Sequence, residues 1–189
     1  MKENLKLGVI LLIISATAAL LLSGTYELTK ETILAQVNAE KNSAMKSILP
    51  EADKFETLKL DLSKYTGITS VDKGLSSGNE VGYVIESSAK GYGGELKLVT
   101  AISLDGKIAG VKVIEHTETP GLGAKCEEPE FTEKYKEKSA SKALSLVSGA
   151  ASTDGEIQSV SGVTITSTAV MDGVNKAMDI YNNELKGGQ

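Results

Sequence analysis

The feature that most constrains this chain is a run of 20 residues without a charged side chain, from Leu7 to Tyr26. An α-helix of that length is about 30 Å long, which matches the hydrocarbon thickness of a bilayer. The hydroxyl groups of Ser15, Thr17 and Ser23 can hydrogen-bond within the same helix, so they do not oppose insertion. The sequence therefore predicts a transmembrane helix over residues 7–26.

A cleaved secretory signal is the alternative for this segment. The apolar part of a signal peptide is about 7–15 residues long and ends at a cleavage site of small residues. Here the small-residue cluster Ala16-Thr17-Ala18 is followed by three more leucines, Leu20 to Leu22. A retained membrane anchor is therefore the favoured interpretation.

The flanking charges predict the orientation of this anchor. Lys2 and Lys6 precede the apolar run, whereas Glu27, Lys30 and Glu31 follow it. Positively charged flanks stay on the cytoplasmic side. We therefore expect a single-pass protein of the cell (inner) membrane, with a cytoplasmic tail at residues 1–6 and an extracytoplasmic body.

Residues 27–50 contain neither glycine nor proline until Pro50. This pattern predicts a helical stalk that ends before Pro50. A more specific role for the stalk is docking to neighbouring membrane subunits. Its loose apolar stripe consists of Leu28, Thr32, Ala35, Ala39, Met45, Ile48 and Leu49.

Composition excludes several classes of function for this chain of 189 residues. A single cysteine, Cys126, and a single histidine, His116, leave no disulfide within the chain and no Cys- or His-based metal site. All 20 basic residues are lysine and the net charge is −5. Nucleic-acid binding is therefore not expected, and a phosphate site cannot use an arginine fork.

The remainder of the chain predicts a small α+β domain at residues 79–186, after a connecting segment at 51–78 and before a tail at 187–189. Alternation of Val81, Tyr83 and Ile85 indicates a strand at 80–88. Two further strands, at 96–104 and 107–116, are joined by Asp105-Gly106, which predicts a type I′ hairpin. Weak strand signals lie at 55–60 and 66–71.

Helices are expected in the second half of the body. They are predicted at 129–138 and 167–185, with a possible helical turn at 141–147 and a short apolar run at 157–160. Strands followed by amphipathic helices are typical of an antiparallel sheet with helices packed against it.

The first candidate site is the loop Glu118-Thr119-Pro120-Gly121-Leu122-Gly123. Pro120 fixes its own φ, and Gly121 and Gly123 permit close approach of the backbone. Such a loop can hold a flat ligand against main-chain atoms. The alternative is a surface turn between a strand and a helix.

The second candidate site is Ser161-Gly162-Val163-Thr164-Ile165-Thr166-Ser167, which leads directly into the last helix. Hydroxyl side chains at this position are typical of an N-cap. A helix start also offers free N–H groups and a positive dipole end, so the same segment can bind phosphate. The residues leave both interpretations open.

Enzyme nucleophile motifs are not found. The chain has no Gly-x-Ser-x-Gly elbow, no P-loop and no Gly-x-Gly-x-x-Gly ahead of a helix. Cys126 is interpreted as a core residue, and His116 as a structural or solvent-facing one. We therefore expect no catalytic residue.

Together these segments resemble the FMN-binding domain of the G subunit of the Rnf electron-transport complex, and of the related C subunit of the sodium-pumping NADH:quinone reductase. The resemblance covers nearly the whole chain. It is carried by the N-terminal anchor and by the segments 91–94 (Gly-Tyr-Gly-Gly), 105–106, 118–123 and 161–164.

The resemblance implies a covalent FMN whose phosphate is esterified to Thr164, attached by a separate flavin transferase that uses FAD. It also implies that the loop Glu118–Gly123 packs against the isoalloxazine ring, and that Ser161 and Thr166 contact the phosphate or ribityl end. The chain departs from the family pattern twice. Val163 replaces the usual Ala, and Gln158 replaces a common Asp.

The function implied is that of a membrane-anchored electron carrier. The complex would move electrons between ferredoxin and NAD and couple this to Na⁺ or H⁺ transport, while this subunit would bind neither NAD nor ferredoxin and would exchange electrons with other membrane subunits. The short chain favours the Rnf G subunit over the quinone-reductase C subunit. A non-redox anchored scaffold, in which the segment around Thr164 merely caps a helix, is the other alternative.

Overall fold

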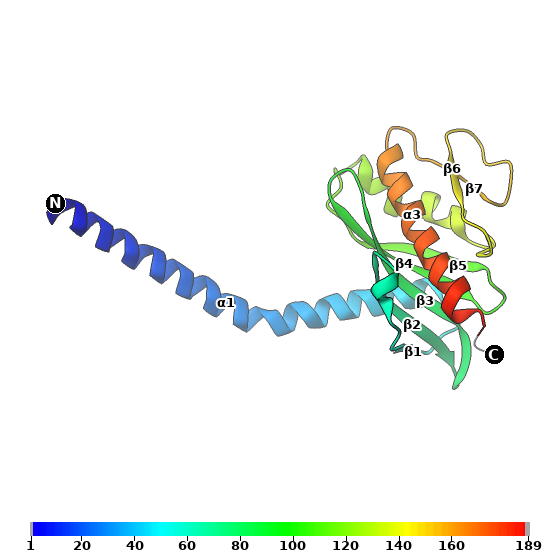
Figure 1. Ribbon diagram of the computed structural model, residues 1–189, viewed down its shortest axis with the longest axis horizontal. Helices are drawn as coiled ribbons and strands as arrows, with labels where there is room; N and C mark the ends of the chain where they lie inside the picture. Colours follow the sequence, from blue (N-terminus) through cyan, green and yellow to red (C-terminus); the bar gives the residue numbers. More distant parts are fainter. Residues whose placement is uncertain (1, 188–189) are drawn as a thin grey trace. The chain divides into compact units, whose positions relative to one another are not determined.

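The computed structural model describes residues 2–187, so residues 1, 188 and 189 of the two predicted tails lie outside it. The chain divides into two units at Lys41/Asn42. The first unit is the greater part of helix α1 (Lys2–Ile48), drawn in blue in Figure 1. The second unit is a body built on a five-stranded sheet.

Helix α1 runs without interruption through the predicted membrane segment and stalk. Among the described residues it is the one helix with a stretch long and apolar enough to cross a membrane. The hydroxyl of Thr17 donates to the Ile13 carbonyl at 2.8 Å, as expected for a hydroxyl within an apolar helix. The helix ends at Ile48, two residues before Pro50, which confirms the predicted end.

The sheet is antiparallel throughout and its strands follow one another in chain order. Its members are β1 (Lys54–Thr57), β2 (Ile68–Ser76), β3 (Asn79–Lys90), β4 (Glu95–Ser103) and β5 (Ile108–Glu115). The segment 51–78, predicted as a connection, thus supplies two strands to the same sheet as the body. The antiparallel α+β fold itself is confirmed.

The hairpin turn between β2 and β3 is of type I′, whereas the one predicted as type I′ between β4 and β5 is not. Ser77 and Gly78 both have positive φ, 51° and 85°, as a type I′ turn requires. At Asp105-Gly106 only the glycine has a positive φ, 77°. Ser103 N–H donates to the Lys107 carbonyl, and Gly106 N–H donates to that of Ser103. This is a three-residue loop that needs a left-handed residue only at its end, so the predicted type I′ turn is wrong there.

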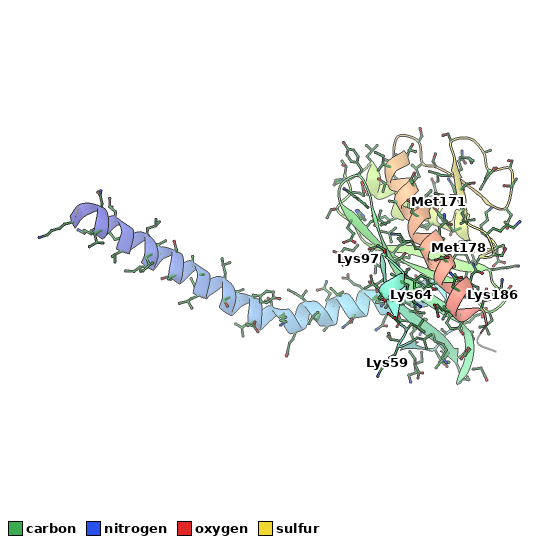
Figure 2. All side chains as sticks on the ribbon, in the orientation of Figure 1. Lys59, Lys64, Lys97, Met171, Met178 and Lys186 are labelled. Atoms are coloured by element: carbon green, nitrogen blue, oxygen red, sulfur yellow. The ribbon has the colours of Figure 1, made fainter. Side chains whose placement is uncertain are left out.

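Helix α3 (Thr164–Ile180) covers one face of the sheet and continues into a π-helical turn, Tyr181–Leu185. Its apolar stripe packs on β3 and β4. Figure 2 labels two residues of this helix, Met171 and the buried Met178. Gly173 lets the helix approach closely, because a Cβ there would overlap Leu98. Ser87 Oγ donates to the Gly173 carbonyl at 2.9 Å.

The opposite face of the sheet is covered by the end of α1 and the turn after it. Its apolar contacts join Ala44, Met45, Ile48, Leu49 and Ala52 to Val84, Val99 and Ala101.

The segment between β5 and α3 is less helical than predicted. It contains a 3₁₀ turn (Gly123–Glu127), then α2 (Pro129–Thr132) and a 3₁₀ turn (Glu133–Tyr135). The predicted helix 129–138 is too long because residues 137–140 hydrogen-bond to the start of β5: Glu137 N–H donates to the Ile108 carbonyl.

The predicted helical turn at 141–147 is wrong. Ser145–Val147 is a strand, β6, which pairs in parallel with β7 (Glu156–Gln158). The side chain of Asn175 forms two hydrogen bonds with the backbone of Leu144. It accepts from the Leu144 N–H at 2.8 Å and donates to the Leu144 carbonyl at 3.0 Å. The final helix begins at Thr164, three residues before the predicted start.

Candidate functional site

The loop after β5 closes as a β-turn from Thr119 to Leu122. Leu122 N–H donates to the Thr119 carbonyl at 3.2 Å, and Gly121 has a φ of 73°. Proline at the second position and a left-handed glycine at the third are typical of a type II turn. Pro120 and Gly121 therefore shape the loop.

A second turn of the same kind precedes α3. Val163 N–H donates to the Val160 carbonyl at 3.2 Å, and Gly162 has a φ of 80°. The chain enters the helix at Thr164, immediately after this turn. Each predicted site segment is thus a glycine-dependent turn of defined shape.

The two turns meet around one cavity of about 450 Å³. Most of the predicted site residues are therefore brought together, although about 40 positions separate the segments. Pro120, Gly121 and Ser161 do not line this cavity. The lining residues are Tyr92, Glu118, Thr119, Leu122, Gly123, Gly162, Val163, Thr164, Ile165 and Thr166. Ile165 belongs to the second predicted segment, whereas Tyr92 is the lining residue whose place at the site the sequence did not predict.

Large apolar side chains stand exposed around this cavity. The exposed fraction is 73% for Tyr92, 57% for Ile165 and 48% for Leu122. Side chains of this kind clustered at a cavity mark a ligand or partner site. A flat, largely apolar ligand fits this lining.

Thr164 is exposed and forms the first turn of α3 on the wall of the cavity. Its hydroxyl hydrogen-bonds to none of the described residues, although its carbonyl accepts from Thr168. The N-cap is Val163, and no side chain caps the helix. The N-cap interpretation of the hydroxyl cluster is therefore not supported, and the first N–H groups of a 17-residue helix remain available to an anion.

The side chain of Ser167 stabilises the turn before Thr164 by two hydrogen bonds. Its fully buried hydroxyl accepts from Val160 N–H at 3.2 Å and donates to the Val163 carbonyl at 3.0 Å. Cys126 Sγ lies 3.6 Å from the same oxygen. Cys126 is 2% exposed, and its burial raises the pKa of the thiol. The interpretation of Cys126 as a core residue is confirmed.

Glu118 directs its carboxylate to the backbone of the turn between β3 and β4. Oε1 accepts from Tyr92 N–H at 2.8 Å and Oε2 from Gly93 N–H at 3.3 Å. Its own N–H donates to His116 Nδ1 at 3.2 Å, while His116 Nε2 lies 3.1 Å from Glu127. His116 is thus structural, which is one of the two roles predicted for it.

Comparison with known proteins matches both parts of the chain. Residues 1–48 match the model of the RnfG N-terminal region, and residues 91–179 match that of the FMN-binding domain. The G subunit of the Na⁺-translocating ferredoxin:NAD⁺ oxidoreductase complex of Acetobacterium woodii is 38% identical over 96% of this chain and 93% of that protein. The chain belongs to the RnfG family.

Further relatives agree with this assignment. The G subunit of the ion-translocating oxidoreductase complex of Methanosarcina acetivorans is 37% identical over 94% of each chain. NqrC of Shewanella oneidensis has a similar structure, with a TM-score of 0.51 and 27% identity over 70% of this chain and 66% of that one. The C subunit of the Na⁺-translocating NADH-quinone reductase of Parabacteroides distasonis shares the fold, with a TM-score of 0.52, 24% identity and 60% coverage of each chain.

The residues of this RnfG chain fit FMN. The apolar cavity suits the isoalloxazine ring, and the hydroxyl of Thr164 and the start of α3 suit the phosphate end. Thr166 is also among the lining residues, and it is buried. Within residues 2–187, no group of His, Cys, Asp and Glu side chains could hold a metal ion.

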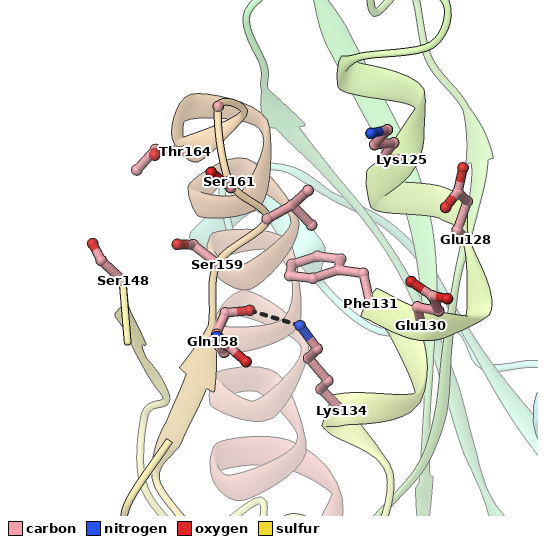
Figure 3. A pocket seen from close by; sticks show the side chains of 12 residues that line it. Lys125, Glu128, Glu130, Phe131, Lys134, Ser148, Gln158, Ser159, Ser161 and Thr164 are labelled. Carbon is pink, nitrogen blue, oxygen red and sulfur yellow. Dashed lines mark hydrogen bonds between the residues drawn. The ribbon is translucent and has the colours of Figure 1, made fainter. Parts of the chain in front are cut away.

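A second, polar cavity of about 500 Å³ lies against the other side of the turn in this RnfG chain and shares Gly162 and Thr164 with the first. Figure 3 shows Ser161 and Thr164 on one wall and Lys125 and Lys134 on the facing wall. Lys134 Nζ donates to the Gln158 carbonyl at 3.3 Å. Ser161, a predicted site residue, lines this second cavity and not the apolar one.

Proposed function

We propose that this chain is the flavin-carrying electron-transfer subunit of a membrane-bound, ion-translocating ferredoxin:NAD oxidoreductase, with FMN esterified to Thr164. The observation that carries the proposal is the free, exposed hydroxyl of Thr164 on the wall of an apolar cavity and at the start of a helix. Relatives are named for Na⁺ or for proton translocation, so the proposal extends to either ion.

The ester forms when the Thr164 hydroxyl oxygen bonds to the flavin-side phosphorus of FAD. The bond from that phosphorus to the bridging oxygen breaks, AMP leaves with the bonding pair, and the hydroxyl proton passes to a base of the flavin transferase. The product is a phosphodiester with one negative charge. The N–H groups at the start of α3 stabilise a single charge without an arginine.

Bound FMN supplies a centre that accepts and donates electrons singly or in pairs. The protein's own residues position it. Thr164 fixes one end by a covalent bond, and the turns at Thr119–Leu122 and Val160–Val163 limit where the other end can lie. Permanent attachment suits an extracytoplasmic domain, because half of all sites with a Kd of about 1 nM are empty at about 1 nM free flavin.

The apolar part of α1 anchors the chain in the membrane, with Lys2 and Lys6 on the cytoplasmic side and the body on the other. Electrons pass between the flavin and other membrane subunits of the complex, and this chain binds neither NAD nor ferredoxin. Protease added outside spheroplasts is expected to digest the body. If the body is instead protected from the protease until the cells are lysed, it lies in the cytoplasm, and the proposed orientation is wrong.

The attachment is tested by intact-mass spectrometry of the full chain after co-expression with a flavin transferase. The expected mass increase is that of FMN less one water, and it is lost in Thr164→Ala. Thr168→Ala, one turn further along α3, is the matched control and keeps the increase. A bare polypeptide mass beside an active transferase, or an ester that survives Thr164→Ala, would overturn the assignment.

A further inference from the structure

Tyr92 is the most exposed aromatic side chain beside the flavin cavity, with 73% of its surface accessible. It belongs to the tight turn between β3 and β4, which Gly91 N–H closes by donating to the Gly94 carbonyl at 2.7 Å. The chain has only eight Phe and Tyr residues and no Trp. Together with the exposed Leu122 and Ile165, this ring forms a cluster of apolar side chains at the cavity, which marks a ligand or partner site.

The backbone around Tyr92 is fixed by one side chain. The two carboxylate oxygens of Glu118, which is 7% exposed, accept from the N–H groups of Tyr92 and Gly93. A carboxylate that accepts two backbone hydrogen bonds makes a strong, directional clamp. These hydrogen bonds therefore hold the backbone from which the ring of Tyr92 projects.

The glycines around this clamp leave no room for side chains. A Cβ at Gly91 would overlap Glu118 Oε1, and one at Gly123 would lie 2.6 Å from Glu118 Oε2. Gly91 belongs to the turn that carries Tyr92, whereas Gly123 follows the turn Thr119–Leu122. Glu118 thus joins the Tyr92 turn to the loop Thr119–Leu122, and both contribute lining residues to the cavity.

We propose that Tyr92 is the stacking residue for the isoalloxazine ring, and that Glu118 is the positioning residue that holds it there. The inference rests on the proposed FMN at Thr164. An ester at that position fixes only the phosphate end, because the ribityl chain has several freely rotating bonds. A flat aromatic face on the cavity wall gives the ring one orientation, and offset stacking of two aromatic systems is favourable.

The stacking is tested by the fluorescence lifetime of the oxidised flavin in the full chain, loaded with FMN by a flavin transferase. A phenol in contact with an excited flavin transfers an electron to it and takes the electron back, which shortens the lifetime. Tyr92→Phe and Tyr92→Leu are expected to lengthen the mean lifetime several-fold. Tyr92→Trp, which keeps a stacked electron donor, is expected to retain the short lifetime.

Tyr65→Phe is the matched control, since the Tyr65 hydroxyl donates to Glu184 and the residue lines neither cavity. It is expected to leave the lifetime unchanged. The intact mass of each sample shows whether FMN is attached, so the proposed ester at Thr164 and the proposed stacking by Tyr92 are tested separately. Absence of the ester in the native sequence would overturn the proposed function, whereas normal loading with the same lifetime in Tyr92→Phe would overturn the stacking.

The role of Glu118 is tested without flavin, by hydrogen exchange of the unloaded chain. Glu118→Gln keeps one acceptor oxygen and replaces the other by an amide that cannot accept. The Tyr92 and Gly93 amides are expected to exchange at least several-fold faster, while amides in α3 keep their rates. After loading, the lifetime is expected to fall between those of the native chain and Tyr92→Leu. Unchanged exchange and an unchanged lifetime would together refute the positioning role.

Discussion

The hydroxyl oxygen of Ser167 lies 3.2 Å from the amide nitrogen of Val160, seven residues earlier, and accepts its hydrogen bond. The same hydroxyl donates to the Val163 carbonyl at 3.0 Å. One buried side chain therefore closes both ends of the turn that presents Thr164. The proposed flavin acceptor, Thr164, therefore depends on a residue that does not line the apolar cavity.

Ser167→Ala is expected to destabilise the body by about 1–3 kcal/mol, because it leaves the Val160 N–H without its acceptor. The turn before Thr164 should loosen, so the yield of flavin ester should fall. Urea unfolding of the full chain in detergent, followed by circular dichroism, measures the first effect. Intact mass after co-expression with the transferase measures the second.

Ser87→Ala is the matched control for this variant. Ser87 is also fully buried, and its hydroxyl donates to the Gly173 carbonyl in the middle of α3. Its loss is expected to cost about 1 kcal/mol and to leave the ester yield unchanged. Equal losses of ester in the two variants would show that global stability, and not the turn, limits loading.

Cys126 should be a native reporter of this turn, because it is the single cysteine and lies beneath Ser167. Burial raises the pKa of its thiol, so the reactive thiolate is scarce at neutral pH. Alkylation by iodoacetamide is expected to be slow in the folded chain, to increase as the pH rises towards that pKa, and to be fast in urea. Ser167→Ala should accelerate the reaction at neutral pH. Native labelling as fast as in urea would contradict the burial.

The sequence alone was sufficient to predict the helices and strands whose residues follow a regular apolar pattern. Three such patterns are the charge-free run at Leu7–Tyr26, the alternation in β3 and the apolar stripe of α3. Each is formed by residues close together in the sequence, so each predicts the secondary structure of its own segment. Gly121 was predicted only to permit close approach of the backbone, and the structure shows a positive φ both there and at Gly162. The two segments of the candidate site could therefore be selected from the order of the amino acids alone.

Elements determined by distant contacts could not be predicted in this way. In β2 and β3 the buried residues include Asp72 and Glu86, so burial no longer matches the apolar pattern. Ser145–Val147 is extended because Asn175, about 30 residues later, holds the preceding Leu144. The contact from Glu118 to Tyr92 also joins positions 26 residues apart. The segment 91–94 could therefore be singled out from the sequence, but Tyr92 could not be placed at the site.

Gly162→Ala is expected to destabilise the body by about 1–2 kcal/mol, because a left-handed φ of 80° is unfavourable for alanine. No atom lies near the added Cβ, so the effect is one of backbone conformation alone. Gly155→Ala is the control, since that glycine also has open space around it but no left-handed φ. Thermal unfolding should show a lower Tm for the first variant and a similar or higher Tm for the second. Equal shifts would contradict the assignment of the turn.

Gly110→Ala is expected to disturb the packing of the last turn of α1 on the sheet, at a cost of about 1–3 kcal/mol from overpacking. A Cβ there would lie 2.9 Å from Ile48 Cβ and 3.2 Å from its Cα, which cannot move without the helix. Gly74→Ala is the matched control. Its added Cβ would lie 2.6 Å from the terminal Cδ2 of Leu49, a contact that a rotation of that side chain relieves, and 3.3 Å from Ala52 Cβ, which requires only a small shift.

Trypsin cleavage after the exposed Lys46 reports this packing, because cleavage requires the end of α1 to unfold locally. The rate should rise clearly in Gly110→Ala and little in Gly74→Ala. Ester formation at Thr164 should persist in both variants, since the end of α1 and α3 cover opposite faces of the sheet. Loss of the ester in Gly110→Ala with an unchanged cleavage rate would show that the two faces are coupled through the sheet.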